Sequence, residues 1–161
     1  MDKIDYRLIS LLKENARMPL KVLAEKVFLS SPATAARIER LEKSGIISSY
    51  GVNVNHKLLG FPITAFINLE VLPSQKTIFY PFIKAHPNVL ECCCVTGKYS
   101  MLIKVAFEST EALDIFIGQL QTFGGTQTQI VFSTAKEETS VDLEKIIEGE
   151  YPEIPDTKTE T

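Results

Sequence analysis

Apolar residues recur at helical spacing in the first third of the chain. In 2–17 they fall at positions i, i+4, i+7 and i+8, and the same spacing returns over 20–27 after a break at Met18-Pro19. Each segment predicts a helix with one buried face. The buried positions are expected to be Ile4, Leu8, Leu11 and Leu12 in the first helix, and Leu20, Leu23, Ala24 and Val27 in the second.

A third helix is expected from Ser31 to Lys43. Ser31 is a suitable cap and Pro32 a suitable first residue, because a proline there lacks only an amide hydrogen that would be unpaired anyway. Gly45 is expected to close the helix in the left-handed conformation that glycine adopts at little cost. The inward stripe is expected at Ala35, Ile38 and Leu41.

The ten residues after Gly45 read IISSYGVNVN. They alternate in part and contain Gly51 with two asparagines, which predicts two short strands around a turn. Three helices followed by a small hairpin are the outline of a winged helix-turn-helix, whose third helix enters the major groove of DNA. Residues 57–60 would form a linker to the rest of the chain.

From Phe61 the apolar spacing changes to that of strands. Strand patterns at 63–71, 89–95, 101–107 and 126–133 are separated by helical spacing over 75–85 and 109–123, and Gly97 to Ser100 interrupts the middle two strands as a hairpin turn. The order βαββαβ is a ferredoxin-like split unit. The expected fold class is therefore α+β, with an N-terminal winged helix-turn-helix followed by a ferredoxin-like domain.

The last 25 residues keep neither pattern for long. Leu143, Ile146 and Ile147 allow a turn or two of amphipathic helix, and the stretch beyond Tyr151 is expected to be disordered. We therefore expect three parts: a winged helix-turn-helix DNA-binding domain with linker at 1–60, a ferredoxin-like domain at 61–136, to which the family resemblance described below assigns effector binding and oligomerisation, and an acidic tail at 137–161.

The distribution of charge agrees with this division. Residues 1–60 carry ten Lys and Arg against six Asp and Glu, 61–136 carry five of each, and 137–161 carry two against nine. A basic first part suggests contact with a polyanion, a neutral middle suggests packing or a small ligand, and an acidic end suggests a solvated tail. The apolar stretches are too short for a membrane span, so we expect a cytoplasmic protein with no membrane partner.

Candidate DNA contacts lie on the third helix, on the side opposite its inward stripe. Small residues let a helix approach the bases closely, and guanidinium groups bind phosphates or guanine edges. The competing interpretation is that the arginines merely pair with Glu39 and other surface acids. The expected contacts to double-stranded DNA are Ser31, Ala33, Thr34, Arg37 and Arg40.

These residues resemble a known family. The stretch LKVLAEKVFLSSPATAARIERLEKSGII, with FPITAFINLEV and VTGKYSMLIKV further on, is similar to the Lrp/AsnC (feast/famine) transcriptional regulators of bacteria and archaea. The resemblance covers about residues 2–136. It implies sequence-specific transcriptional regulation, an amino acid or related metabolite bound between subunits of the second domain, and homodimers that assemble further into octamers.

The turn of the second domain departs from the family pattern. Many members have Gly-Asp-Tyr-Asp there, near the amino acid site; here Gly97 and Tyr99 match, while Lys98 and Ser100 replace the acids. A carboxylate could offset the ammonium group of an amino acid, whereas a lysine would repel it. An altered effector, recognition by main-chain groups, and no effector all stay open. The candidate effector residues are Gly97, Lys98, Tyr99, Ser100, Thr126 and Thr128, although threonines on a strand are more often simple strand formers.

Other chemistry finds little support in the sequence. Cys92 and Cys94 would point to one face of a strand and Cys93 to the other, so we expect small buried hydrophobes rather than a redox pair. His56 and His86 lack partners at ligand spacing, so no metal or other cofactor and no enzymatic activity is expected. The alternative function is a small-molecule sensor or ring former that does not bind DNA.

Overall fold

The computed structural model describes residues 1–136 and 141–152, which form two compact units. One unit holds Met1–Asn53 with the C-terminal segment, and the other is Val54–Glu137. The domain limits expected from the sequence, at residues 60 and 136, stay a prediction. Among the described residues no helix has the length and apolar character needed to cross a membrane.

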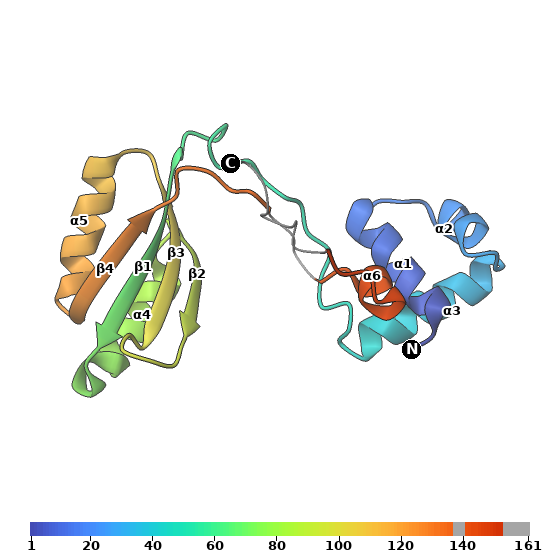
Figure 1. Cartoon of the computed structure of the whole chain (residues 1–161), viewed down its shortest axis with the longest axis horizontal. Coiled ribbons are helices and arrows are strands. Elements are labelled where there is room, and N and C mark those ends of the chain that lie inside the picture. The colour runs from blue at the N-terminus through green and yellow to red at the C-terminus, as the bar shows by residue number, and fades with distance from the viewer. Residues whose placement is uncertain (137–140, 153–161) are drawn as a thin grey trace, which may run out of the picture. The chain divides into compact units, whose positions relative to one another are not determined.

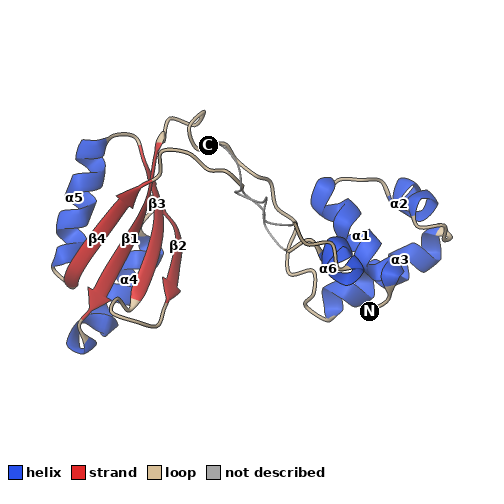
Figure 2. Ribbon diagram, viewed as in Figure 1, coloured by secondary structure: helices blue, strands red, loops and turns tan. Residues whose placement is uncertain are grey.

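The N-terminal part of the first unit consists of three helices, α1 (Lys3–Glu14), α2 (Leu20–Lys26) and α3 (Ser31–Lys43), as Figures 1 and 2 show. The predicted buried faces of the first two helices are confirmed for Leu8, Leu11, Leu23, Ala24 and Val27, while Ile4 and Leu12 are half-buried; the predicted burial of Leu20 is wrong, since it is exposed. Gly45 adopts the predicted left-handed conformation, with φ of 75°. The core of this unit is formed by Leu8, Leu11, Leu23 and Val27, with Ile4, Leu12, Met18, Leu29 and Ile38 packed against it.

The predicted capping residue of α3 is wrong by one position. Ser30 is the cap: it has extended backbone angles, and its hydroxyl accepts a hydrogen bond from the amide of Ala33 at 3.3 Å. Ser31 is already helical, and Pro32 lies in the first turn, where its missing amide hydrogen costs nothing. Two neighbouring serines were equally good candidates, and the backbone path from α2 selects the first.

The predicted hairpin after α3 is also wrong. Residues 46–55 contain no strand and run as an irregular segment, which Tyr50 ties to α3 by donating a 2.6 Å hydrogen bond to Glu42. The alternating pattern has no core to cover, since Val52 is 83% exposed. An isolated two-stranded hairpin without a buried face is marginal in water. The unit is therefore a helix-turn-helix whose wing region lacks strands.

The second unit confirms the ferredoxin-like order. Its antiparallel sheet has the strand order β2-β3-β1-β4, so the first and third strands in sequence lie at the centre. The elements are β1 (Ile63–Val71), a short 3-10 helix η1 (Pro73–Gln75), α4 (Lys76–Ala85), β2 (Val89–Cys94), β3 (Met101–Phe107), α5 (Thr110–Gln121) and β4 (Gly124–Ile130).

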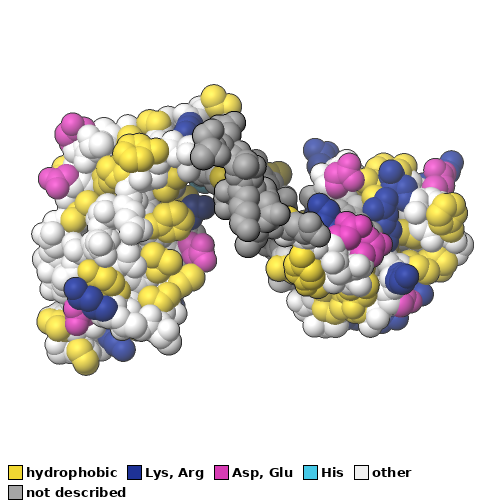
Figure 3. Space-filling model, viewed as in Figure 1, with side chains coloured by type: hydrophobic (Ala, Val, Ile, Leu, Met, Phe, Trp, Pro, Cys, Tyr) yellow, Lys and Arg dark blue, Asp and Glu magenta, His cyan; other side chains and the backbone are white. Residues whose placement is uncertain are grey.

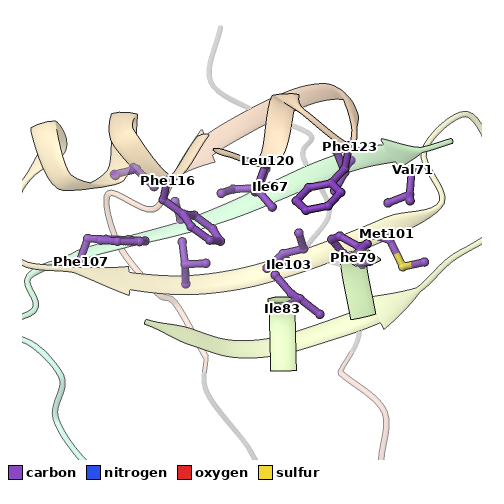
Figure 4. Close-up of a cluster of buried hydrophobic side chains, with 14 residues drawn as sticks. Ile67, Val71, Phe79, Ile83, Met101, Ile103, Phe107, Phe116, Leu120 and Phe123 are labelled. Atoms are coloured by element: carbon purple, nitrogen blue, oxygen red, sulfur yellow. The ribbon is translucent and has the colours of Figure 1, made fainter. Parts of the chain in front are cut away.

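One face of this sheet is covered by α4 and α5. Alternate residues of the central strand, from Ala65 to Val71, are buried against both helices, as the strand pattern predicts. Figure 4 shows the resulting core, in which the aromatic rings of Phe79, Phe116 and Phe123 lie among aliphatic side chains of the strands. Burial of this continuous apolar layer is the main stabilising contribution to the unit.

Strand β4 begins two residues before the predicted start. Gly124 is already paired with Val71, and its backbone lies so close to β1 that a Cβ atom there would be 1.8 Å from the carbonyl oxygen of Glu70. The two glycines at 124 and 125 therefore begin the strand instead of only ending the preceding helix. The early start of β4 follows from its close contact with β1, and the local sequence around the two glycines does not reveal that contact.

The C-terminal segment contributes a short helix, α6 (Leu143–Glu148), which belongs to the first unit and packs against α1. Asp142 caps it, and Lys13 of α1 donates a hydrogen bond to the carbonyl oxygen of Val141 at 3.4 Å. The predicted short helix is thus confirmed, but Ile146 and Ile147 of its expected apolar face are both exposed. The disorder expected beyond Tyr151 concerns residues that lie almost entirely outside the described range.

Candidate nucleic-acid interface and effector site

Helix α3 presents small side chains at its N-terminal end. Ala33 is exposed and Ser31 is half-buried, as the sequence analysis expected for residues next to DNA. Thr34, by contrast, is 0% exposed, and its hydroxyl donates a 3.0 Å hydrogen bond to the carbonyl oxygen of Ser30. The expectation that Thr34 lies on the outer face is therefore wrong.

The inward stripe of α3 explains this error. Thr34 and Leu41 are buried and the half-buried Ile38 packs against the core, whereas the half-buried Ala35 is not among the residues packed there. Positions 34, 38 and 41 follow the spacing i, i+4 and i+7, which is the usual period of a buried helical face. Hydropathy predicts that Thr34 lies at the surface because its side chain is polar. Its hydroxyl, however, donates a hydrogen bond to the Ser30 carbonyl oxygen, and its methyl group is free to pack.

Two arginines of α3 converge on the N-terminus of α1. The Nη1 atom of Arg37 lies 2.8 Å from Asp2 Oδ2 and 2.8 Å from Asp5 Oδ1, and Arg40 Nη2 lies 2.8 Å from both carboxylate oxygens of Asp5. Asp5 is 1% exposed. The two acids also form a capping box, in which each carboxylate accepts the other's backbone amide at 3.0 Å.

The electrostatics of this cluster hold both acids ionised. Burial raises the pKa of Asp5, but the amide of Asp2 and the guanidinium of Arg37 outweigh this effect, so the pKa lies below its ordinary value. The pKa of Asp2 is lowered mainly by its hydrogen bond from Arg37. Because these bonds join α3 to the N-terminus of α1, the cluster fixes the orientation of α3 relative to α1.

The competing interpretation, that the arginines pair with acids, therefore holds in part, but the acids are Asp2 and Asp5 and not Glu39. Glu39 pairs with Lys43 at 2.6 Å and not with either arginine. Arg37 is 24% exposed and largely occupied by its carboxylates, whereas Arg40 is 60% exposed. Figure 3 shows Lys and Arg side chains interspersed with Asp and Glu on the visible face of this unit.

Asp2 and Asp5 are the site residues that sequence reasoning missed. A signal was available: Asp5 occupies the apolar face of α1, three residues before Leu8. An acid on a buried stripe needs a cationic partner, because an unpaired buried charge is costly. The pattern therefore allowed a partner to be expected, but the sequence could not say that α3 supplies it.

The candidate effector turn joins β2 to β3. Gly97 has φ of 111°, a left-handed conformation that favours glycine, and Lys98 Nζ lies 5.3 Å from the centre of the Tyr99 ring. The Ser100 hydroxyl accepts a 3.0 Å hydrogen bond from the amide of Val71. The exposed Lys98 is the charged group of this turn, and Ser100 is engaged with the end of β1.

The two candidate threonines lie on β4, across β1 from the turn. Thr126 pairs with Leu69 and Thr128 with Ile67, so both side chains are on the helix-covered face and are half-buried. Thr126 also accepts a 3.4 Å hydrogen bond from Gln121 of α5. Thr126 and the turn thus lie at the same end of the sheet, with β1 between them, while Thr128 lies further along the strand.

The cysteines alternate as expected for a strand. Cys92 pairs with Ile103 on the helix-covered face, and Cys93 pairs with Leu102 on the other face. Burial raises the pKa of the Cys92 thiol, and a hydrogen bond to Glu91 raises that of Cys93. Thiols with raised pKa values are weak nucleophiles at neutral pH. The expected burial is wrong, however, since Cys92 and Cys93 are half-buried and Cys94 is exposed.

A helix-turn-helix unit joined to a ferredoxin-like unit defines a class of DNA-binding regulators, and comparison with known proteins assigns the family. A family model described as winged helix-turn-helix DNA-binding matches residues 1–48, and one described as Lrp/AsnC ligand binding domain matches residues 64–141. The regulator LrpC of Bacillus subtilis is 32% identical over 83% of this chain and 92% of its own length.

Solved structures agree. The structure of B. subtilis LrpC superposes with a TM-score of 0.82 at 30% identity, covering 86% of this chain and 99% of that chain. The regulator NMB0573 of Neisseria meningitidis, solved as a complex with L-Met, superposes with a TM-score of 0.84 at 26% identity, covering 91% and 99%. The chain belongs to the Lrp/AsnC family, and it is a DNA-binding transcriptional regulator of that type.

Proposed function

We propose that the first turn of α3 reads operator DNA in the major groove, with Ser31 and Ala33 beside the base edges and Arg40 on a phosphate or a guanine edge. The observation that carries this proposal is the pairing of α3 with the buried carboxylate of Asp5, which fixes the helix while its first turn stays accessible. Small side chains allow close approach, and a guanidinium donates to guanine or phosphate oxygens.

The remaining candidates take a supporting role in this proposal. Thr34 is buried and bonded to Ser30, and Arg37 is held by two carboxylates, so both position α3 without touching the bases. Arg40 keeps its exposure while bonding to Asp5 through one nitrogen. It is therefore the arginine best able to reach DNA.

A gel-shift titration with the promoter fragment upstream of the protein's own gene tests this assignment. Because phosphate contacts release counterions, we expect affinity to fall steeply across a salt series. Arg40→Ala should lower affinity roughly tenfold. Lys84→Ala, which removes one exposed charge from α4 in the other unit, is the matched control and should bind as the unsubstituted protein does. Equal affinity of the Arg40 variant and the control would contradict the assignment.

We further propose that the β2-β3 turn senses an amino acid or a related metabolite between subunits. Lys98 is exposed and carries a positive charge, which favours a carboxylate of the ligand and disfavours an ammonium group. The Neisseria relative was solved with L-methionine, which supports a small metabolite as the class of ligand. Thr126 is the β4 residue best placed to contribute.

Thermal shift with a panel of amino acids and the corresponding 2-oxo acids tests this second proposal. Any ligand that binds the folded protein and not the unfolded chain raises the midpoint, and the stabilisation grows with the logarithm of its concentration over its Kd. The 2-oxo acids should raise it more than the amino acids, and Lys98→Ala should abolish the difference. A panel without any effect would favour a regulator that has no effector.

We propose finally that the protein works in the cytoplasm as a regulator and not as an enzyme, through homodimers that assemble to octamers. The sheet face away from α4 and α5 carries Phe66 and Leu102, both half-buried, which suits a subunit contact.

Sedimentation should give multiples of the 18.0 kDa chain. Phe66→Glu should dissociate the assembly, whereas Gln119→Glu on α5 should leave it intact. Footprints should show half-sites about one helical turn apart.

A further inference from the structure

The turn between α2 and α3 is built around a left-handed phenylalanine. Phe28 has φ of 55°, and among the described residues it is the only non-glycine residue with positive φ. The amide of Leu29 donates to the carbonyl oxygen of Ala24 at 3.0 Å, and the amide of Phe28 donates to that of Glu25 at 3.3 Å. This is the Schellman pattern of helix ends, in which the left-handed position is usually glycine.

A bulky side chain at this position is unfavourable for folding. The left-handed conformation brings Cβ close to the following carbonyl, a strain that glycine avoids. Phe28 gains no compensating burial in its own unit, because its side chain is 93% exposed. The neighbouring Leu29 packs against the helical core and accounts for the apolar contact that such a helix end needs. The fold therefore does not require Phe28.

The position of Phe28 adjoins the DNA interface. It precedes the cap Ser30 by two residues, so it lies next to the first turn of α3 along the chain, with its side chain exposed. In helix-turn-helix proteins that turn is the part of the recognition helix that contacts base edges. Lys26, the exposed last residue of α2, lies two positions earlier in the chain and carries a positive charge.

We propose that Phe28 is a further DNA contact, which places its ring against deoxyribose carbons and thymine methyl groups at the edge of the major groove. Apolar contact with the thymine methyl is a recognised form of base readout, and the aromatic ring offers a large apolar area with few rotamers to fix. This inference rests on the proposed binding of DNA by α3. The strain in the turn then serves recognition and not stability.

The test compares Phe28→Gly with the unsubstituted full-length protein. Glycine relieves the strain, so the midpoint of thermal unfolding should rise by about 4 °C or more, while affinity for the operator fragment should fall about fivefold or more. Phe28→Tyr keeps the ring and should bind within about twofold of the original. Ile115→Ala, which shortens an exposed apolar side chain on α5, is the control and should change neither quantity.

Operator fragments with uracil in place of thymine identify the contact. Removal of the methyl groups should weaken binding by the unsubstituted protein about fourfold for each methyl contacted, and should weaken Phe28→Gly less. Equal affinities of the two proteins would overturn the inference, and so would a lower unfolding midpoint of the glycine variant. If the unsubstituted protein failed to bind any operator fragment, the proposed function itself would be wrong, which separates the two failures.

Discussion

Asp5 is a single carboxylate on which the orientation of α3 depends. It lies on the apolar face of α1, is 1% exposed, and accepts hydrogen bonds from both arginines of α3 and from the backbone amide of Asp2. A buried carboxylate with several donors is stable only as a complete cluster. Loss of one member therefore affects both the stability of the unit and the direction of α3.

Asp5→Asn tests this dependence. The amide keeps the size of the side chain but removes its charge, so Arg37 and Arg40 lose their common partner. We expect the free energy of unfolding to fall by about 2 to 3 kcal/mol in urea denaturation. Glu39→Gln breaks the exposed pair with Lys43 and should change it by less than about 0.5 kcal/mol. Similar losses in the two variants would show that the cluster contributes no more than a surface ion pair.

The same cluster predicts a dependence on acid pH. The pKa values of Asp2 and Asp5 are lowered in the folded protein, so their contribution to stability is present above the unfolded value of about 3.9 and is lost as the pH falls through the folded values. The unfolding midpoint should therefore decrease below about pH 4. Asp5→Asn should show a smaller decrease, and an unchanged pH dependence in that variant would contradict the assignment.

At the scale of elements, most helices and strands follow from the spacing of apolar residues, and the exceptions share one cause. The strands expected after α3 do not form, since Val52 has no core to cover. Strand β4 begins at Gly124 because β1 lies against it. The inward face of α3 passes through Thr34 because its hydroxyl bonds to Ser30. Each depends on neighbours that are distant in sequence or on bonds that hydropathy does not express.

Gly124→Ala tests the close approach of β4 to β1. A Cβ atom at 124 would be 1.8 Å from a backbone oxygen, and φ of 156° is also unfavourable for alanine. Since backbone atoms cannot move aside easily, we expect a loss of about 3 kcal/mol or more in the free energy of unfolding. Gly125→Ala meets no atom within 4 Å and should cost less than about 1 kcal/mol. If both variants unfolded alike, β4 would have another position.

At the scale of the whole molecule, the N-terminal helices and the segment 141–152 belong to the same compact unit. The basic first part and the acidic segment that contains α6 carry opposite charge, and α6 packs against α1. Two interpretations of the acidic segment follow: it keeps the assembly soluble, or it shields the basic unit until DNA competes. The contact with α1 favours the second, because it keeps the acidic residues 148 and 150 on the DNA-binding unit.

Truncation after Thr139 distinguishes the two. If the segment shields the basic unit, the truncated protein should bind operator DNA more tightly at low salt, and the difference should disappear at high salt because screening weakens the repulsion. Glu148→Gln with Glu150→Gln removes two charges while keeping α6, and should give part of the effect. Unchanged affinity at low salt in both proteins would leave only the role in solubility.

The sequence by itself determined the class of the fold and the family, because apolar periodicity specifies which faces are buried and the motif stretches are long. It also located the helix at 31–43, the turn at Gly97, and the separation of a basic N-terminal part from an acidic C-terminal part. Only the tertiary structure decided which side chains of α3 are available, that Asp5 binds both arginines, and that Phe28 is strained and exposed. The arginines that pair with Asp5 lie more than 30 residues away in the sequence, and the strain at Phe28 comes from the path of the backbone between α2 and α3. The periodicity of apolar residues carries no information about either.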